Sequence, residues 1–288
     1  MENTKTYSII IPAYNEADTI AKTLNGLKVY IENNNLDCNI VVVNDGSTDD
    51  TQNILKQIPG ILFINHPYNK GYGASVKTGV AAVNSEWIIT FDSDGQHKLE
   101  DIKRLIDAKQ DFDMVVGARK GYQGPAIRQP GKKVLHKVAE FLVEKKIDDL
   151  NSGLRLLRKE HFQKYARILP NAFSWTSTIT LAFFKDNLNV KYIPIEINKR
   201  QGGKSMVKTS DAVKTLMLIL RIIMLFSPLR IFLPASVILF TLGCASTVYD
   251  LWMFNISDTT ILLFISSILI FFFGLLADQI AAIRRELK

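Results

Sequence analysis

Residues 87–97 read WIITFDSDGQH, an apolar run that ends in two aspartates one residue apart. The first five residues have the length and the β-branched content of a buried strand. Asp92 and Asp94 then follow at its carboxyl end, where two carboxylates can bind one hard divalent cation and, through it, a diphosphate. Because Asp and Gly are also common turn residues, a plain turn is the alternative interpretation. An EF-hand fits poorly, since Gln96 occupies its third acidic position and no Glu closes the loop.

Short apolar runs of the same kind recur on both sides of this stretch. They are Tyr7–Ile11, Asn39–Asn44, Ile61–Asn65 and Met114–Ala118. Between the runs lie stretches with helical character, namely Glu16–Glu32, Thr48–Gln57, Gly73–Val83 and Leu99–Lys109. Alternating strands and helices predict an α/β fold with a mainly parallel sheet covered by helices. In such sheets ligands bind beyond the carboxyl ends of the strands, so the loops there are the candidate sites.

Polar groups and glycines stand in the loops after the second and third runs. Asp45 follows the second run, where a carboxylate can accept hydrogen bonds from a base or a ribose, but building an Asp-Gly turn is an equally good interpretation. Gly71 and Gly73 follow the third run and allow the backbone to approach a phosphate closely before a helix begins. Taken alone this glycine signal is weak, and it is not a Walker loop. A single histidine is more often structural, so His97 is left out of the predicted metal ligands.

Two uncharged runs of 19 residues stand near the end of the chain, Ile231–Tyr249 and Thr259–Ala277. At about 1.5 Å per residue, each is nearly long enough to cross a ~30 Å hydrocarbon core. The connector, residues 250–258, carries two acidic residues and no basic one, whereas Arg230 and a basic tail flank the two runs. The positive-inside rule therefore predicts a transmembrane hairpin with both ends in the cytoplasm. A buried helical hairpin of a soluble protein is the alternative.

The segment before this hairpin is strongly basic. From Lys199 to Arg230 there are seven Lys or Arg residues and one Asp, within a chain of formal net charge +7. Such a segment beside a bilayer favours attraction to anionic lipid, and a solvated charged surface is the plainer alternative. Within it, residues 211–226 have the pattern of a helix lying in the membrane interface, with Lys214 and Arg221 reaching the headgroups. Nucleic-acid binding is disfavoured, because the stretch carries no recognisable nucleic-acid motif.

The cysteines and the N-terminus indicate a reducing compartment. The two cysteines, Cys38 and Cys244, cannot form a disulfide framework or a metal cluster. The first residues, MENTKTYSIII, lack the basic-then-apolar order of a signal peptide, so none is expected.

Four motifs occur in sequence: IPAYNE (11–16), VNDGSTDDT (43–51), NKGYGAS (69–75) and FDSDGQH (91–97). Their order and intervals resemble those of the family-2 inverting glycosyltransferases with the GT-A fold. Residues 149–155, DLNSGLR, resemble the Asp-Pro-Thr-Ser-Gly-Phe-Arg signature of dolichyl-phosphate mannose synthases but depart from it at Leu150, Asn151 and Leu154. Residues 199–205, KRQGGKS, resemble an Arg…Gly-Lys-Ser motif of polyprenyl-phosphate glycosyltransferases. Residues 226–230, FSPLR, before a two-helix tail are typical of bacterial members.

This resemblance implies the residues of the site. The nucleotide-sugar would be bound by Pro12, Ala13, Tyr14, Glu16, Asp45, Lys70, Gly71 and Asp92. A Mg²⁺ or Mn²⁺ ion would be held by Asp92, Asp94 and Gln96. The lipid phosphate would be bound by Arg119, Arg128, Arg155, Arg200, Lys204 and Ser205, for which simple attraction to a membrane surface is the plainer alternative. Catalysis would depend on Asp94, Arg119, Arg200 and Asp149, the last as an orienting residue.

The implied reaction is transfer of one sugar from a UDP-hexose or GDP-mannose to undecaprenyl or dolichyl phosphate. A lipid phosphate is already anionic and needs no strong general base, so catalysis would depend on positioning and charge neutralisation, with inversion at the anomeric carbon. None of the tryptophans belongs to the Gln-x-x-Arg-Trp motif of processive synthases, which favours a single transfer. The alternatives are a family-2 transferase acting on a glycan or a lipid-linked saccharide, and a non-catalytic membrane scaffold.

The predicted organisation has three parts. Residues 1–208 form a GT-A (Rossmann-like) domain, residues 209–228 an interfacial amphipathic helix region, and residues 229–288 a transmembrane hairpin with a short tail. We expect a multi-pass protein of the inner membrane, with the catalytic domain and both termini in the cytoplasm. The resemblance also allows a homo-oligomer.

Overall fold

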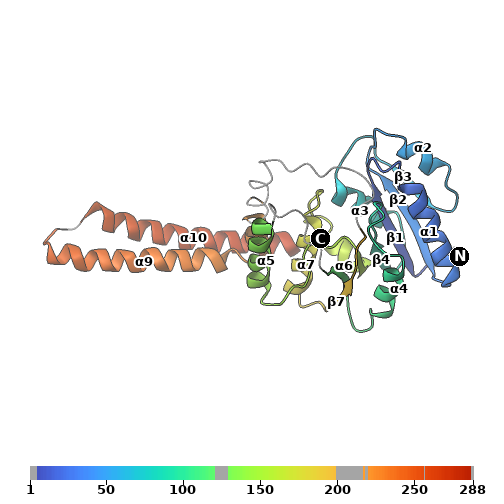
Figure 1. Cartoon of the computed structure of the whole chain (residues 1–288). Helices are drawn as coiled ribbons and strands as arrows, with labels where there is room; N and C mark the ends of the chain where they lie inside the picture. The colour runs from blue at the N-terminus through green and yellow to red at the C-terminus, as the bar shows by residue number, and fades with distance from the viewer. Residues whose placement is uncertain (1–4, 121–128, 199–216, 218–219, 256, 287–288) are drawn as a thin grey trace. The chain divides into compact units, whose positions relative to one another are not determined.

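The computed structural model describes residues 5–120, 129–198, 217, 220–255 and 257–286. The chain divides into two compact units (Figure 1). The first comprises Met1–His136 and Lys145–Thr209, and the second comprises Lys137–Glu144 and Ser210–Lys288.

The first unit is built on a seven-stranded sheet with the strand order β3-β2-β1-β4-β6-β5-β7. The strands are β1 (Tyr7–Ala13), β2 (Cys38–Asn44), β3 (Leu62–Asn65), β4 (Trp87–Thr90), β5 (Met114–Arg119), β6 (Arg155–Arg158) and β7 (Val190–Ile195). Strand β6 runs antiparallel to both of its neighbours, and the other pairs are parallel. The predicted mainly parallel α/β sheet is therefore confirmed, with two strands, β6 and β7, that were not predicted.

Helices follow the strands along the chain. They are α1 (Ile20–Asn33), α2 (Thr51–Lys56), α3 (Tyr72–Ala81), α4 (Glu100–Asp107), α5 (Gln129–Val143), α6 (Lys159–Tyr165) and α7 (Trp175–Lys185). Both α6 and α7 follow β6, and the part of α5 from Lys137 on belongs to the second unit. Helices α1 to α4 coincide with the four predicted helical stretches, and their ends differ from the predicted ends by a few residues at most. Helix α1 begins at Ile20 rather than at Glu16, because the residues between them belong to the loop beyond β1.

Both faces of the sheet are covered by helices, as the alternation of side chains along β1 shows. Ile9 and Ile11 belong to a buried core that includes residues of α1 and α4. Ile10 points to the other face, where a Cβ atom on Gly79 of α3 would lie 2.5 Å from its Cγ2. Because successive strand residues face opposite sides, the uninterrupted apolar run of β1 is what a strand buried on both faces requires.

The second unit contains two long helices, α9 (Leu229–Trp252) and α10 (Asp258–Glu286), which lie side by side (Figure 1). Both are long and apolar enough to cross a membrane. Gly243 lies against Phe264, and a Cβ atom on Gly274 would lie 2.6 Å from Cβ of Phe232, so glycine allows close helix packing at both places. The two predicted 19-residue runs lie within these helices.

Polar contacts close the hairpin at its turn and at the start of α9. A carboxylate oxygen of Asp250 accepts hydrogen bonds from the backbone N–H of Ser257 (2.8 Å) and from the hydroxyl of Thr260 (2.6 Å). Arg230 donates to the backbone oxygen of Phe141 and pairs with Glu144, which ties the end of α5 to the start of α9. Half of the predicted interfacial helix lies outside the described residues, and residues 220–226 are helical.

Candidate active site at the carboxyl edge of the sheet

The predicted donor-site residues lie beyond the carboxyl ends of β1, β2, β3 and β4, which are neighbours in the sheet. Pro12 and Ala13 end β1 inside the sheet, whereas Tyr14 is 43% exposed just beyond it. Asn15 has a positive φ of 54° and joins the first two loops. Its N–H donates to Ser47 Oγ (2.9 Å), and its side-chain oxygen accepts from the N–H of Thr48 (2.8 Å).

Asp45 is buried at the end of β2 and accepts three hydrogen bonds. Its Oδ1 accepts from His66 Nδ1 (2.7 Å) and from the N–H of Lys70 (2.9 Å), and its Oδ2 accepts from the N–H of Gly71 (2.8 Å). Burial favours the neutral carboxyl, but these donors outweigh it and lower the pKa of Asp45. The carboxylate therefore fixes the β3–α3 loop, which agrees with the turn-building interpretation and leaves a role toward a nucleoside as a proposal.

The glycines of the β3–α3 loop allow close approach of protein backbone. A Cβ atom on Gly71 would lie 2.4 Å from the oxygen of Asn171, and one on Gly73 would lie 2.3 Å from the oxygen of Pro170. The N–H of Ala74 also donates to the Asn171 oxygen (3.2 Å). In this structure the space beside the glycines is thus taken by residues 170–172, which differs from the expected approach to a phosphate.

Asp92 and Asp94 lie in the loop after β4, in different surroundings. Asp92 Oδ1 accepts from the hydroxyl of Tyr72 (2.6 Å), and its Oδ2 lies 3.1 Å from His97 Nε2. Burial opposes ionisation, but these donors and the charge of Arg119 lower the pKa of Asp92. Asp94 is half-buried, and its Oδ1 accepts from the N–H of Gln96 (3.1 Å).

The loop that carries these carboxylates is fixed by its contacts with residues 197–198. His97 forms an isolated antiparallel bridge with Ile197, and the N–H of Asn198 donates to the oxygen of Gln96 (2.9 Å). His97 is buried against Asp92, which agrees with a structural role rather than with a metal ligand. Oxygen-rich side chains suit Mg²⁺ or Mn²⁺, but no cluster of three His, Cys, Asp or Glu residues occurs in the described part of the chain. Asp92 and Asp94 are the carboxylates that would hold such an ion.

Arg119, the last residue of β5, is held by Asp149. The guanidinium donates from Nε to Oδ2 (2.7 Å) and from Nη2 to Oδ1 (2.9 Å), so the pairing is bidentate. Burial would raise the pKa of Asp149, but the pairing with Arg119 and the N–H groups of Arg119 and Asn151 lower it. Asp149 thus holds the guanidinium of Arg119 in one orientation, and its engaged oxygens do not suit a general base.

Arg155 occupies a position that does not fit contact with a lipid phosphate. The residue is fully buried at the start of β6, where burial lowers its pKa to about 10. Its guanidinium donates to the backbone oxygens of Leu150 and Ser152 and to the hydroxyl of Thr180. The other residues expected at the lipid phosphate lie outside the described part of the chain: Arg128, Arg200, Lys204 and Ser205.

A model of glycosyl transferase family 2 matches residues 8–166, which is more than half of the chain and contains Asp45, Asp92, Asp94, Arg119 and Asp149. The chain belongs to glycosyltransferase family 2. A second model, described as the GtrB C-terminal hairpin, matches residues 227–283 of this family-2 glycosyltransferase and spans α9 and most of α10.

Named relatives and a solved structure agree with this assignment. A UDP-N-acetylglucosamine–dolichyl-phosphate N-acetylglucosaminyltransferase of Methanococcus voltae is 28% identical over 73% of this chain and 94% of that protein. A dolichyl-phosphate beta-glucosyltransferase of Trichomonas vaginalis is 30% identical over 72% and 69%. The crystal structure of glucosyl-3-phosphoglycerate synthase from Mycobacterium tuberculosis with Mn²⁺ and UDP is 17% identical, covers 76% of this chain and 79% of that one, and has a TM-score of 0.60. This likeness confirms the predicted GT-A (Rossmann-like) fold.

In this family-2 glycosyltransferase, Tyr72 also contacts a predicted site residue, Asp92, although no motif in the sequence marks Tyr72 itself. Its ring stacks on Phe173 with the centroids 4.8 Å apart and the planes at 14°, while its hydroxyl donates to Asp92. Burial, followed by the charge of Asp92, raises the pKa of Tyr72 well above its usual value, so the hydroxyl stays a donor. Only its place between Gly71 and Gly73 in the third loop could have drawn attention to it.

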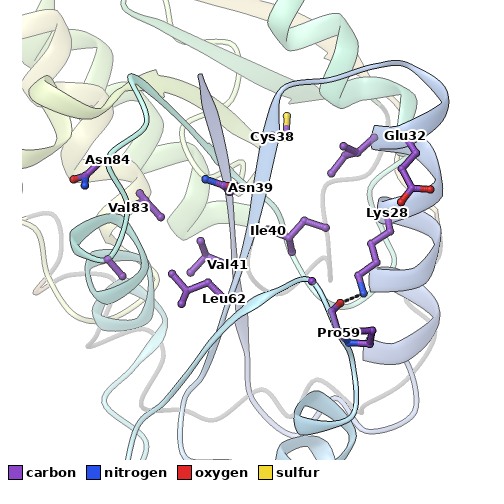
Figure 2. Close-up of a pocket in the computed structure, with 13 residues that line it drawn as sticks. Lys28, Glu32, Cys38, Asn39, Ile40, Val41, Pro59, Leu62, Val83 and Asn84 are labelled. Carbon is purple, nitrogen blue, oxygen red and sulfur yellow. Dashed lines mark hydrogen bonds between the residues drawn. The ribbon is translucent and has the colours of Figure 1, made fainter. Parts of the chain in front are cut away.

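A groove in this unit lies away from these carboxylates. It has a volume of about 940 Å³ and is lined by residues that include Lys28, Cys38 and Leu62 (Figure 2). Cys38 and Leu62 begin β2 and β3, so the groove lies at the amino ends of the strands and Asp45 at the opposite end. It contains none of the predicted site residues.

Proposed function

We propose that this glycosyltransferase transfers one sugar from a nucleotide-sugar to a polyprenyl phosphate. The observation that carries the proposal is the pairing of Arg119 with Asp149 in the same unit as the carboxylates of Asp92 and Asp94, in a chain that continues into a membrane-type hairpin. Two of the relatives are named as dolichyl-phosphate transferases, which supports the same class of acceptor.

On the donor side, the chain offers carboxylates and hydrogen-bonding loops. Asp92 and Asp94 would hold Mg²⁺ or Mn²⁺, which supplies charge neutralisation of the leaving diphosphate when bound. Tyr72 and His97 fix Asp92 from two sides, so its carboxylate is oriented before the donor arrives. Tyr14 is exposed beyond β1, and Asp45 holds the neighbouring loop, which supports a nucleoside site between the first two strand ends.

On the acceptor side, the reaction needs a cation more than a base. A phosphate monoester oxygen is already a nucleophile at neutral pH, so binding and orientation contribute most of the rate enhancement. Arg119 has a planar guanidinium that suits phosphate, and Asp149 fixes its orientation. In-line attack of the lipid phosphate oxygen on the anomeric carbon expels the nucleoside diphosphate and inverts the configuration. Asp149 has its pKa lowered and its oxygens engaged, so we assign it no proton transfer.

The two apolar helices support a membrane location. Only 11% of the most apolar part of α9 and 22% of that of α10 are buried, which is unlike the core helices of a soluble protein. Arg230 lies at the start of α9, whereas Asp250 and Asp258 flank the turn. By the positive-inside rule we propose that both ends of the hairpin, and the catalytic unit with them, are cytoplasmic.

The test is transfer of radiolabelled sugar from a panel of UDP- and GDP-sugars to undecaprenyl and dolichyl phosphate in detergent with Mn²⁺ or Mg²⁺. We expect labelled lipid with at least one donor, loss of the product with EDTA, and loss of it in Asp94→Ala. Labelled product only on a glycan or a lipid-linked saccharide would identify the rival acceptor. Nucleotide binding by folded protein without transfer to any acceptor would point instead to a non-catalytic scaffold.

A further inference from the structure

Arg155 is a buried cation that the proposed reaction does not use directly. Its side chain is fully buried, and in the described part of the chain no carboxylate forms an ion pair with it. An unpaired buried charge is costly, so its hydrogen bonds must compensate for lost hydration. The positions of these hydrogen bonds indicate what the residue does.

The guanidinium binds the backbone of the loop that leads into β6. Nε donates to the oxygen of Ser152 (2.7 Å), and Nη2 donates to the oxygen of Leu150 (3.0 Å). Nη1 donates to Thr180 Oγ1 of α7 (2.6 Å), and the guanidinium carbon lies 5.9 Å from the ring centroid of Trp175. The Arg155 side chain thus connects two carbonyl groups of the loop to helix α7.

The same loop is held at its other carbonyls by neighbouring strands. The oxygen of Gly153 accepts from the hydroxyl of Thr90, and the oxygen of Leu154 accepts from the N–H of Gly117 (3.0 Å). Four carbonyls in the loop therefore have defined donors, and Arg155 supplies two of them. Because a planar guanidinium has donors in a fixed fork, it sets the direction of both carbonyls at once.

The loop brings two groups to the candidate active site. At its start, Asp149 holds Arg119 by two hydrogen bonds. Near its end, Gly153 lies so close to Asp92 that a Cβ atom would be 2.5 Å from Oδ2. The conformation of residues 149–153 therefore affects both the acceptor-side cation and a donor-side carboxylate.

We propose that Arg155 is a positioning residue, which fixes the loop of residues 149–154 so that Asp149 orients Arg119 and Gly153 supports Asp92. It touches no substrate and acts through these two contacts. The inference rests on the proposed function for its meaning in catalysis, but the structural part can be measured separately.

The experiment compares the full chain in detergent with Arg155→Lys, which keeps the charge and loses the fork. We expect faster amide hydrogen exchange of the peptide covering residues 149–154, and a fall in kcat/KM for the lipid phosphate on the order of 10- to 100-fold, since small misplacements have effects of this size. Ser152→Ala is the matched control in the same loop. The Ser152 hydroxyl is buried without a partner among the described residues, so its loss should change neither readout.

A double-mutant cycle separates positioning from a general structural role. If Arg155 acts through Asp149, the two substitutions remove the same interaction and their effects should not add. In an Asp149→Asn background, Arg155→Lys should therefore lower kcat/KM by less than about threefold. Fully additive losses would overturn the positioning of Asp149 by Arg155. So would unchanged hydrogen exchange in a folded Arg155→Lys protein.

A milder pair of variants covers the case in which Arg155→Lys does not fold. Thr180→Val removes the hydroxyl that accepts from Nη1, whereas Thr180→Ser keeps it. We expect faster loop exchange and slower transfer only for Thr180→Val, and equal behaviour of the two would contradict the proposal. If the wild type transfers no sugar to any polyprenyl phosphate, the proposed function fails, while the exchange measurements still decide the role of Arg155.

Discussion

At the residue scale, burial and hydrogen bonding have opposite effects on the pKa of three carboxyl groups, those of Asp45, Asp92 and Asp149. Burial favours the neutral form of each, yet hydrogen-bond donors outweigh it and lower the pKa of all three carboxyls. A carboxyl whose pKa is depressed by folding contributes stability above its unfolded pKa, which is about 3.9 for Asp. That stability is lost as the pH falls through the folded pKa. The acid sensitivity of the first unit should therefore begin below about pH 4.

Asp149→Asn tests this assignment. The variant loses the ion pair with Arg119, so its thermal unfolding midpoint should lie below that of the wild type at pH 6. The difference should shrink as the pH falls below about 4, because the wild-type carboxyl then becomes protonated as well. Asp148→Asn is the control. Asp148 is half exposed, and its contact with Lys146 is weak because the two charged atoms are as far as 3.9 Å apart. Its replacement should change the unfolding midpoint little at either pH. A gap between Asp149→Asn and wild type that stays constant with pH would contradict the assignment.

Arg155 shows where residue-level prediction reaches its limit. The acids at the strand ends could be predicted, because a polar side chain after a buried strand must lie at the edge of the sheet. A cation in a motif says nothing about whether it faces solvent or the interior. The partners of Arg155 are mainly backbone oxygens, which every sequence contains, so no pattern distinguishes this buried arginine from one that binds phosphate.

At the scale of elements, apolar runs in the sequence predicted strands β1 to β5 but not β6 and β7. The runs for β1 to β5 were visible because each is apolar and followed by a polar loop. Strand β6, RLLR, has charged ends and is too short to stand out, yet it inserts between β4 and β5. That insertion brings the loop of residues 149–154 next to Asp92. The proposed acceptor side of the site therefore depends on a pairing between distant segments that local patterns do not encode.

The contact between the β3–α3 loop and residues 170–172 gives a prediction for Gly73→Ala. Its new methyl group would lie 2.3 Å from the oxygen of Pro170 and must displace backbone. We expect a loss of about 1–3 kcal/mol of stability and weaker binding of the donor nucleotide, because Tyr72 and its hydrogen bond to Asp92 would shift. Thermal unfolding and calorimetric titration with UDP and GDP measure the two effects.

Gly60→Ala provides the matched comparison for this variant. Gly60 has a φ of +71° and open space around its Cβ position, so alanine there costs roughly 1–2 kcal/mol of backbone strain without moving a neighbour. Its thermal midpoint should fall while nucleotide binding stays at the wild-type level. Equal weakening of nucleotide binding in both variants would show that binding does not depend on the contact between the β3–α3 loop and residues 170–172.

At the scale of the whole molecule, the hairpin gives the chain an orientation that can be measured. Asp250 and the turn residues form a closed polar group at one end of α9, and Arg230 pairs with Glu144 at the other. The apolar surface between them is mostly exposed, with large side chains such as Leu242, Val248 and Phe273 outside any protein core. A protein surface of this kind needs lipid as its solvent. By the positive-inside rule, we predict that the turn lies on the side of the membrane opposite to the first unit.

The two native cysteines make this orientation accessible to labelling in the full chain. Burial raises the pKa of Cys38 to about 12, so little thiolate forms there, and Cys244 lies within the span of α9. Both should react slowly with a membrane-impermeant maleimide, which leaves a low background. In bacterial cells whose outer membrane alone has been made permeable, Asn255→Cys in the turn should be labelled. Lys185→Cys, at the end of α7 in the first unit, should react only after lysis. The reverse pattern would place the catalytic unit outside, where nucleotide-sugars are not made, and would contradict both the topology and the proposed donor.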